Sequence, residues 1–270
     1  LSVANLGSYS SGNVYSGYFD SDKCYTYAFG GSLDNSWFNP VSAANGRRCS
    51  GARQWSGNFL NWAATPTIDP FRSALTGGAR VRDDVGLTVL QKARHSGQNS
   101  AGNRLNSGQG LLPASEIAGA TPFAANWAGF YVRLEGQGFD MLFSNWNDRI
   151  GGGGSADYGA GNNMSSVWVN LDPNDNNQWN GNLLRADYTA GSILNSTRYS
   201  VYRVRVQVKV CDPNIGLEAN CKRYSANNYK PEGLLQQYSD KLRYSVFSYL
   251  NDSSATRDGG VLRANQSFIG

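Results

Sequence analysis

The stretch YSVYRVRVQVKVC, from Tyr199 to Cys211, decides the fold class. Tyrosine or valine stands at every second position from Tyr202 to Val210, and arginine, glutamine or lysine stands between them. A period of two, with one apolar and one polar side, is typical of a β-strand with one dry and one wet face. The strand predicted over 199–210 is the clearest in the chain.

The chain continues from this strand into a polar loop, a helix and a second strand. Cys211 and Cys221 flank the loop, which is rich in turn residues and could be closed by a disulfide. Pro231, followed by apolar residues at helical spacing up to Leu242, predicts a short amphipathic helix with the proline in its first turn. The run RYSVFSYL over 243–250 predicts a strand that a turn at 251–254 ends.

Upstream, the first 94 residues predict short elements separated by loops. Residues 1–20 predict an irregular arm, and the alternating aromatics of 25–29 predict a short strand followed by a loop that runs to Cys49. The block WSGNFLNWA at 55–63 has aromatic residues at helical spacing, which predicts a buried helix. The alternative is an aromatic platform for a ligand.

Two further helices are predicted, one over 68–75 that Gly77 and Gly78 end and one over 88–94. Pro66 and Pro70 leave the length of the first of them open.

The middle of the chain is turn-rich. Residues 96–120 predict polar turns, and the alternation at 130–134 and 139–143 predicts a β-hairpin. The glycine run at 151–161 lacks the lysine of a phosphate loop and predicts a flexible connection. The run SVWVNL at 166–171 predicts another strand.

Several unusual blocks, in this order, resemble one known family. They are YSGYFDSDKCYTY at 15–27, WSGNFLNWA, IDPFRSAL at 68–75, VKVCDPNIGLEANCKRY at 208–224, YKPEGLLQQYSDKLRYSVFSYLND at 229–252 and RDGGVLR at 257–263. Together they resemble the N-terminal half of the PilC/PilY family of type IV pilus tip adhesins and assembly factors. The resemblance spans most of the chain, and it departs from the family pattern at Pro66 and Pro70.

Four cysteines allow three pairings. The pairs Cys24–Cys49 and Cys211–Cys221 are preferred, because each is flanked by turn residues and belongs to a separate block of the resemblance. Each bridge would add about 2 to 4 kcal/mol of stability and would indicate an oxidising compartment. Free thiols or a zinc site are the alternatives, although no Cys-x2-Cys spacing is present and His95 is the only histidine.

Composition excludes some classes of protein. Charged residues make up 16% of the 270, the net charge is only +4, and lysine and arginine are scattered, so a nucleic-acid footprint is not expected. No stretch approaches the ~20 apolar residues that a membrane helix needs. No signal peptide begins at Leu1, so we expect a mature chain or a fragment of a larger polypeptide.

Two segments could present oxygen ligands to a metal ion, the first of them to calcium. Asp172, Asn174 and Asn176 resemble the start of a calcium loop, although the glycine and glutamate that such a loop needs are missing. Asp252, after the strand at 243–250, begins a pattern similar to the metal site of a von Willebrand factor A domain, but a turn is the ordinary explanation. No cofactor is otherwise expected, and His95 lacks the Gly-x-Ser-x-Gly elbow of a hydrolase.

The predicted architecture is mixed α and β, rich in strands, with a few short helices. Residues 1–198 would form a β-rich elaboration, and residues 199–270 would supply a helix and strands to a von Willebrand factor A-like sheet. If the rest of that domain is absent, the strand at 199–210 needs partners, and its donation into a pilin or a neighbouring subunit is one hypothesis.

The predicted function is that of a non-enzymatic, exported component of type IV pili, acting in pilus assembly and in adhesion at the pilus tip. Pilins or minor pilins, a host or abiotic surface, and the rest of its own polypeptide are the expected partners. The alternative is a secreted glycan-binding module that uses Trp146 and Trp179.

Overall fold

The computed structural model describes residues 8–94, 112–122, 131–134, 139–144, 186–187, 200–241, 243–252 and 257–267. The described helices are short: α1 (Gly57–Ala64), α2 (Ile68–Thr76), α3 (Ala114–Ala120), the single turn α5 (Leu234–Gln237) and the 3-10 turn η1 (Leu33–Asn35). The described strands are β1 (Lys23–Ala28), β2 (Trp37–Ala43), β3 (Gln54–Ser56), β4 (Arg80–Asp84), β5 (Leu87–Gln91), β6 (Tyr131–Leu134), β7 (Asp140–Ser144), β8 (Ala186–Asp187), β9 (Ser200–Arg205), β10 (Gln207–Val210), β11 (Cys221–Ser225), β12 (Asn228–Pro231), β13 (Tyr244–Asp252) and β14 (Arg257–Ser267). The predicted fold class, mixed and strand-rich with short helices, is confirmed.

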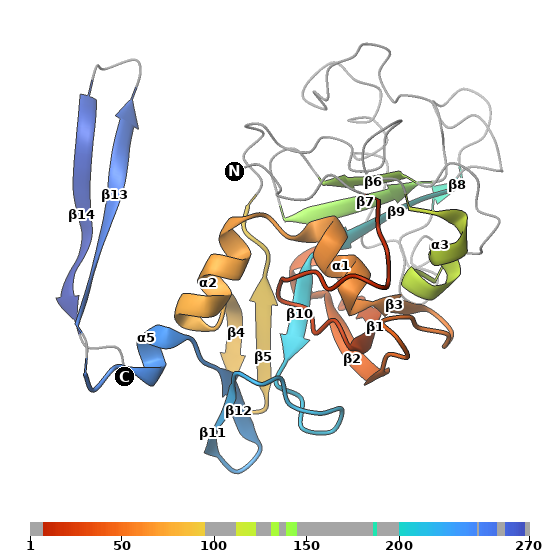
Figure 1. The fold of residues 1–270 in the computed structure, drawn as a ribbon, viewed down its shortest axis with the longest axis horizontal. Helices are drawn as coiled ribbons and strands as arrows, with labels where there is room; N and C mark the ends of the chain where they lie inside the picture. The colour runs from red at the N-terminus through yellow and green to blue at the C-terminus, as the bar shows by residue number, and fades with distance from the viewer. Residues whose placement is uncertain are drawn as a thin grey trace.

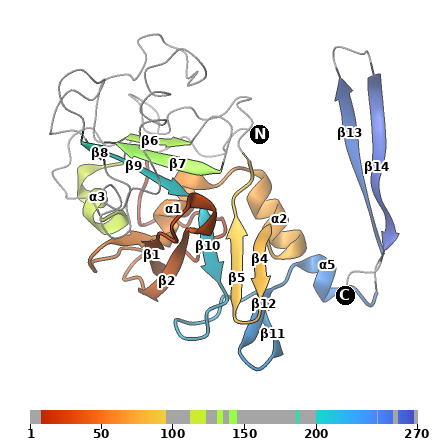
Figure 2. The ribbon, with the colours of Figure 1, turned by 180° about the vertical axis from the view of Figure 1, so that it is seen from behind.

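A six-stranded sheet forms the centre of the described structure (Figure 1). Its strand order is β3-β1-β2-β10-β5-β4, and all neighbours are antiparallel except β2 and β10, which pair in parallel at Phe38 and Val208. Helix α1 packs against β1 and β3, and α2 packs against α5. Figure 2 shows the same arrangement from behind.

The strand predicted over 199–210 is two strands in two sheets. β9 pairs with β7 and β8 in a four-stranded sheet, whereas β10 lies between β2 and β5 in the central sheet. The break falls at Val206, whose N–H donates to the carbonyl of Phe139 at 2.9 Å and whose carbonyl accepts from the Lys92 N–H at 3.1 Å. Both halves have partners within the chain, so the hypothesis that this segment is an unpaired strand for donation is wrong.

Aromatic side chains fill the core, and α1 lies at its centre. All eight residues of α1 are buried. The Ser56 hydroxyl caps the N-terminus of the helix by accepting a hydrogen bond from the Phe59 N–H at 3.3 Å. The rings of Phe59 and Trp62 pack against each other with their centroids 5.9 Å apart, and Trp55 stacks on Phe59. The core-filling interpretation of the WSGNFLNWA block is therefore confirmed, and the ligand platform is wrong for these rings.

The arm predicted over 1–20 is irregular where it is described, but it belongs to the core. Tyr9, Tyr15, Tyr18 and Phe19 are all buried. The Phe19 ring lies edge-on to Tyr25 of β1, with the centroids 5.2 Å apart. An irregular segment can be buried in this way only if its backbone polar groups find partners, as they do below.

Helix α2 confirms the second predicted helix and resolves its length. It ends at Gly77, which has the left-handed φ of 76° that favours glycine. Pro66 precedes the helix, and Pro70 lies in its first turn, where backbone N–H groups have no partner within the helix. Neither proline shortens it.

The third predicted helix, over 88–94, is wrong because β5 occupies 87–91. Thr88 and Val89 are β-branched and favour a strand, and Gly86, with a φ of 76°, makes the tight turn that joins β5 to β4. The hairpin places β5 against β10, so tertiary pairing overrides the helical spacing.

Two elements lie where loops were predicted. β2 passes through Pro40, which the sheet tolerates because the proline faces Tyr25 of β1 next to a β-bulge and is not paired with β10. α3 begins directly after Pro113, in the stretch predicted as polar turns. Its Gly119 carbonyl accepts from the Cys49 N–H at 2.8 Å, so contacts from far along the sequence hold this short helix.

The predicted helix after Pro231 is only one turn long, and Pro231 itself ends β12. The predicted strand at 243–250 is confirmed as β13, but it continues through Asn251 and Asp252, where a turn was expected. The hairpin predicted at 130–143 is confirmed by the antiparallel pair β6–β7. The predicted segments at 96–111, 151–161 and 166–171 lie outside the described residues.

The division of the chain near residue 198 and the von Willebrand factor A-like sheet stay predictions. Strands from both sides of that boundary share the central sheet, since β10 lies between β2 and β5.

Candidate functional site

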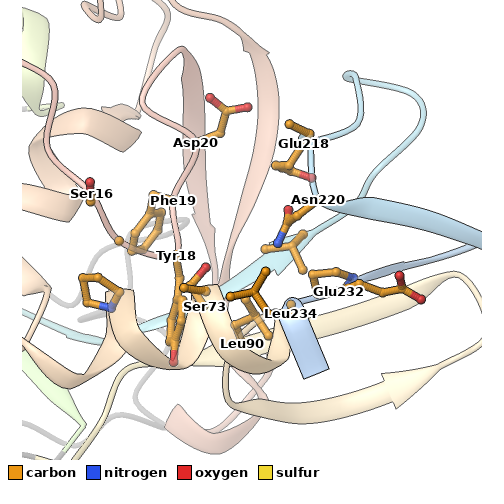
Figure 3. Close-up of a pocket in the computed structure, with 18 of the residues that line it drawn as sticks. Ser16, Tyr18, Phe19, Asp20, Ser73, Leu90, Glu218, Asn220, Glu232 and Leu234 are labelled. Carbon is orange, nitrogen blue, oxygen red and sulfur yellow. The ribbon is translucent and has the colours of Figure 1, made fainter. Parts of the chain in front are cut away.

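A pocket of about 740 Å³ lies where three segments of the chain meet, and we call it the α2–α5 pocket (Figure 3). The segments are residues 16–20, helix α2 with Gly77, and the stretch from Glu218 to Gln237. The lining residues are Ser16, Gly17, Tyr18, Phe19, Asp20, Pro70, Ser73, Ala74, Gly77, Leu90, Val210, Glu218, Ala219, Asn220, Pro231, Glu232, Gly233, Leu234 and Gln237.

Two buried asparagines of α1 hold residues 16–20, which form the first wall of the pocket. The Asn61 amide accepts from the Phe19 N–H at 3.0 Å and donates to the carbonyls of Tyr15 and Phe19 at 2.9 and 2.8 Å. Asn58 accepts from the Tyr15 N–H at 3.0 Å. A Cβ on Gly17 would lie 2.2 Å from the Asn61 oxygen, so only glycine fits this approach. These bonds satisfy the backbone of the irregular segment.

The Cys211–Cys221 disulfide braces the second wall. The Cα atoms of the two cysteines are 5.6 Å apart, and Cys211 has a φ of 57°. Glu218 lies inside the closed loop, where one carboxylate oxygen accepts from the Cys211 N–H at 2.7 Å. Lys23, on β1, donates to the other oxygen at 2.7 Å and to the Gly216 carbonyl at 2.6 Å. The loop is thus fixed to the central sheet by a covalent bond and a buried ion pair.

Close packing of α2 on α5 makes the third wall. A Cβ on Gly233 would lie 2.2 Å from the Leu75 carbonyl carbon, and one on Gly77 would lie 2.2 Å from the Pro231 oxygen. The Gln236 side chain donates to the Thr76 carbonyl at 3.1 Å and accepts from the Gly233 N–H at 3.1 Å. Both glycines are needed because backbone meets backbone here.

The lining of the pocket combines apolar and polar side chains. Phe19, Leu90 and Leu234 supply apolar surface, and Ser73 and Asn220 supply neutral polar groups (Figure 3). Three carboxylates, of Asp20, Glu218 and Glu232, also line the pocket, whereas the lining residues include no lysine, arginine, histidine or cysteine. The pocket therefore suits a ligand that is apolar in part and neutral or positively charged.

A buried carboxylate lies behind the first wall. Asp69 on α2 is 1% exposed and accepts from the Ala93 N–H with both oxygens, at 3.0 and 2.9 Å. Burial raises the pKa of Asp69 above its ordinary value of 3.8, and hydrogen bonds from the Ala93 N–H and the Tyr18 hydroxyl offset part of this rise. Burial likewise raises the pKa of Tyr18.

The raised pKa of Asp69 predicts a specific pH dependence of stability. The folded chain keeps a proton on Asp69 at pH values where the unfolded chain has lost it, so the free energy of unfolding should fall as pH rises above 3.8. Asp69→Asn cannot titrate and should flatten this slope in urea unfolding measured between about pH 3.5 and 7. The same slope in both proteins would contradict the assignment.

A second feature is the hairpin β13–β14, which forms a two-stranded sheet of its own. Both ribbon views show it standing clear of the rest of the described fold (Figures 1 and 2). Phe247 and Leu262 face each other across its strands, and they are 70% and 46% exposed. A lone hairpin is marginally stable in water, and exposed apolar pairs mark interaction surfaces. The hairpin is therefore a candidate contact surface.

The structure joins the cysteines in the two pairs that the sequence predicted, Cys24–Cys49 and Cys211–Cys221. Within the described residues, one group of metal-type ligands comes together, formed by Cys211, Glu218 and Cys221. Its two sulfurs are bonded to each other, so they are not available as thiolate ligands.

Most of the other candidates from the sequence lie outside the described residues. Asp172, Asn174, Asn176 and His95 lie outside the described residues, as do Trp146 and Trp179. Asp252 ends β13, opposite Arg257 of β14.

Sequence reasoning missed the α2–α5 pocket. Asp20 and Glu218 are almost two hundred positions apart in the sequence, and no local pattern joins them. The one usable signal was Asn58 and Asn61 inside an otherwise apolar helix, because buried amides need partners.

Comparison with known proteins identifies the family. A family model described as PilY1 homolog, small alpha/beta domain, matches residues 7–141. A type IV pilus biogenesis factor PilY1 homolog of Xylella fastidiosa (strain Temecula1) is 41% identical over 278 aligned positions, which cover the whole chain. The chain belongs to the PilY1 family. A second PilY1 homolog of the same organism is 26% identical over 94% of the chain.

Membership of the PilY1 family confirms the resemblance drawn from the sequence and relates the chain to type IV pilus biogenesis. The chain spans 20% and 16% of the lengths of these two relatives. No solved structure matches it. None of the helices in the described ranges has the length and hydrophobicity that crossing a bilayer requires.

Proposed function

We propose that this chain is a non-enzymatic part of a type IV pilus component that acts in pilus assembly and in surface adhesion at the pilus tip. The observation that carries the proposal is the 41% identity to a type IV pilus biogenesis factor, which extends over the whole chain. Pilins or minor pilins are the proposed partners within the pilus, and a host or abiotic surface is the proposed target of adhesion.

The disulfides support an exported, surface-associated protein. Both bridges connect buried or half-buried cysteines, and disulfides of this kind persist in oxidising compartments. The hairpin β13–β14 supports a contact role, because its open edges and its exposed Phe247 offer a partner both backbone and apolar groups.

The chemistry of the α2–α5 pocket supports a non-enzymatic role. Catalysis by a nucleophile needs a base within hydrogen-bond reach of it. The described lining contains no histidine and no cysteine, and the Glu218 carboxylate is occupied by Lys23 and a backbone N–H. This arrangement suits binding better than proton transfer.

The test uses source cells that carry the full-length protein with the hairpin altered. Phe247→Asp combined with Leu262→Asp should reduce surface pili or attachment at least severalfold, since it places charge on the contact surface. Val85→Asp, at an exposed apolar residue of the β4–β5 turn, is the matched control and should leave both unchanged. The number of pili per cell is counted by electron microscopy, and attachment of the cells to a surface is measured in a binding assay.

Two measurements separate the parts of this proposal. Mass spectrometry of sheared, purified pili should find peptides of this chain. Normal pilus number with lost attachment would favour adhesion over assembly. Peptides found only in soluble secreted fractions, with normal pili in the hairpin variant, would overturn the proposal and favour a secreted glycan-binding module.

A further inference from the structure

We propose that the α2–α5 pocket binds a peptide segment of a partner protein that presents an apolar side chain next to a lysine or arginine. This inference deepens the proposed function, because it states which chemistry a protein partner must offer. It does not depend on the hairpin.

The volume and the floor of the pocket define the apolar part of the ligand. A pocket of about 740 Å³ is within the usual range for small ligands and short peptide segments. Phe19 and Leu90 are buried beneath it, whereas Leu234 is 47% exposed and forms part of its wall. A large exposed leucine at the edge of a concave site is a natural contact for an apolar side chain.

Neutral polar groups at the pocket suit a peptide backbone. Asn220 and Ser73 line the pocket from different segments (Figure 3). Among the described residues, neither side chain has a hydrogen-bond partner. The asparagine amide offers both a donor and an acceptor, which is the pair of groups that a peptide unit presents. The Tyr18 hydroxyl is already engaged, since it accepts from the Ala79 N–H at 3.1 Å.

The carboxylates of the lining favour a ligand that carries a basic residue next to its apolar side chain. Lys23 lies 2.7 Å from Glu218 but 3.4 Å from Asp20, so the ammonium is committed mainly to Glu218. Glu232 is buried, where its carboxylate accepts from the Tyr224 hydroxyl at 2.6 Å and lies 3.7 Å from the Lys222 ammonium. Asp20 is the most exposed of the three carboxylates and the one that Lys23 contacts at the longer distance, so its side of the pocket favours a positively charged ligand over an anion.

A metal ion is a poorer occupant than a basic peptide. The carboxylates of Asp20, Glu218 and Glu232 do not form a described group close enough to share one ion, and the group that includes Glu218 consists otherwise of the two bonded sulfurs. A lysine or arginine combines an apolar stem with a charged end, which matches a lining that holds both apolar side chains and carboxylates.

The ligand is tested with four capped dipeptides and the 270-residue chain. Acetyl-Leu-Lys-amide and acetyl-Leu-Arg-amide should bind about tenfold more tightly than acetyl-Leu-Glu-amide or acetyl-Ser-Lys-amide, as measured by NMR titration. The amide signals of Phe19, Asn220 and Gly233 should shift during the titration. Equal affinities for the four peptides, or shifts confined to other regions, would overturn the proposal.

Matched variants test the site. Leu234→Ser should weaken binding of acetyl-Leu-Lys-amide about fivefold, whereas Leu217→Ser, at a similarly exposed leucine outside the lining, should not. Asp20→Asn should weaken it about threefold, and Asp22→Asn, at an exposed carboxylate outside the pocket, should leave it unchanged. Equal effects within either pair would remove the pocket as the site.

The outcome of the dipeptide titration does not depend on the outcome of the pilus experiment. Dipeptide binding without pilus association would retain the pocket and reject the pilus role, and the reverse outcome would reject the pocket alone.

Discussion

Replacing Asn61 with leucine is expected to lower the free energy of unfolding by about 3 to 5 kcal/mol. The Asn61 side chain is buried and satisfies three backbone groups, the Phe19 N–H and the carbonyls of Tyr15 and Phe19. Leucine has the same branching of heavy atoms but no polar atom, so all three groups would lose their partner in a dry environment. Each buried group left without a partner costs about 1 to 3 kcal/mol.

Urea unfolding followed by tryptophan fluorescence measures this change. Asn45→Leu is the matched control, because Asn45 is exposed in the turn between β2 and Cys49, and its effect should stay within about 0.5 kcal/mol. If Asn61→Leu were as stable as the wild-type chain, residues 15–19 would not be held by α1, and the first wall of the α2–α5 pocket would need another explanation.

Removing the Cys24–Cys49 bridge is the second large effect. The double substitution Cys24→Ser and Cys49→Ser should cost about 3.5 kcal/mol, because the bridge closes a segment of 25 residues and restricts the unfolded chain. Both cysteines are buried, so serine hydroxyls at these positions add to the loss.

The Cys211–Cys221 bridge allows the effect of loop length on stability to be compared. Cys211→Ser with Cys221→Ser removes a loop of 10 residues and should cost less, about 2.7 kcal/mol. Unfolding midpoints of both variants, measured without reductant, test this order. A larger loss from the shorter loop would show that local contacts, such as that of Glu218 with the Cys211 N–H, outweigh the effect of loop length.

The sequence predicted correctly those helices and strands whose formation depends on neighbouring residues. The helix at 57–64 was predictable because its aromatics recur at helical spacing, and the end of α2 because glycine follows it. The hairpin β6–β7 and the strand β13 were predictable from alternation. The cysteine pairs were predicted with the help of the family resemblance.

The errors occurred where contacts distant in sequence decide the structure. The residues of β5 have helical spacing, yet the strand forms because β10, more than a hundred positions later, pairs with it. Nothing in the alternation of 199–210 shows that Val206 passes the chain from one sheet to another. The carboxylates and neutral side chains of the α2–α5 pocket come from three distant segments, so their meeting is a property of the fold.

The two covalent bridges also set how the molecule responds to tension. A chain that unravels under load lengthens by at most about 3.5 Å per residue. The residues enclosed by the bridges cannot contribute to this lengthening while the sulfurs stay bonded. We expect an oxidised chain stretched from its ends to stop about 110 Å short of its reduced length. Even with every strand pulled apart, the two loops would remain closed, which limits how far an applied load can extend this part of the protein.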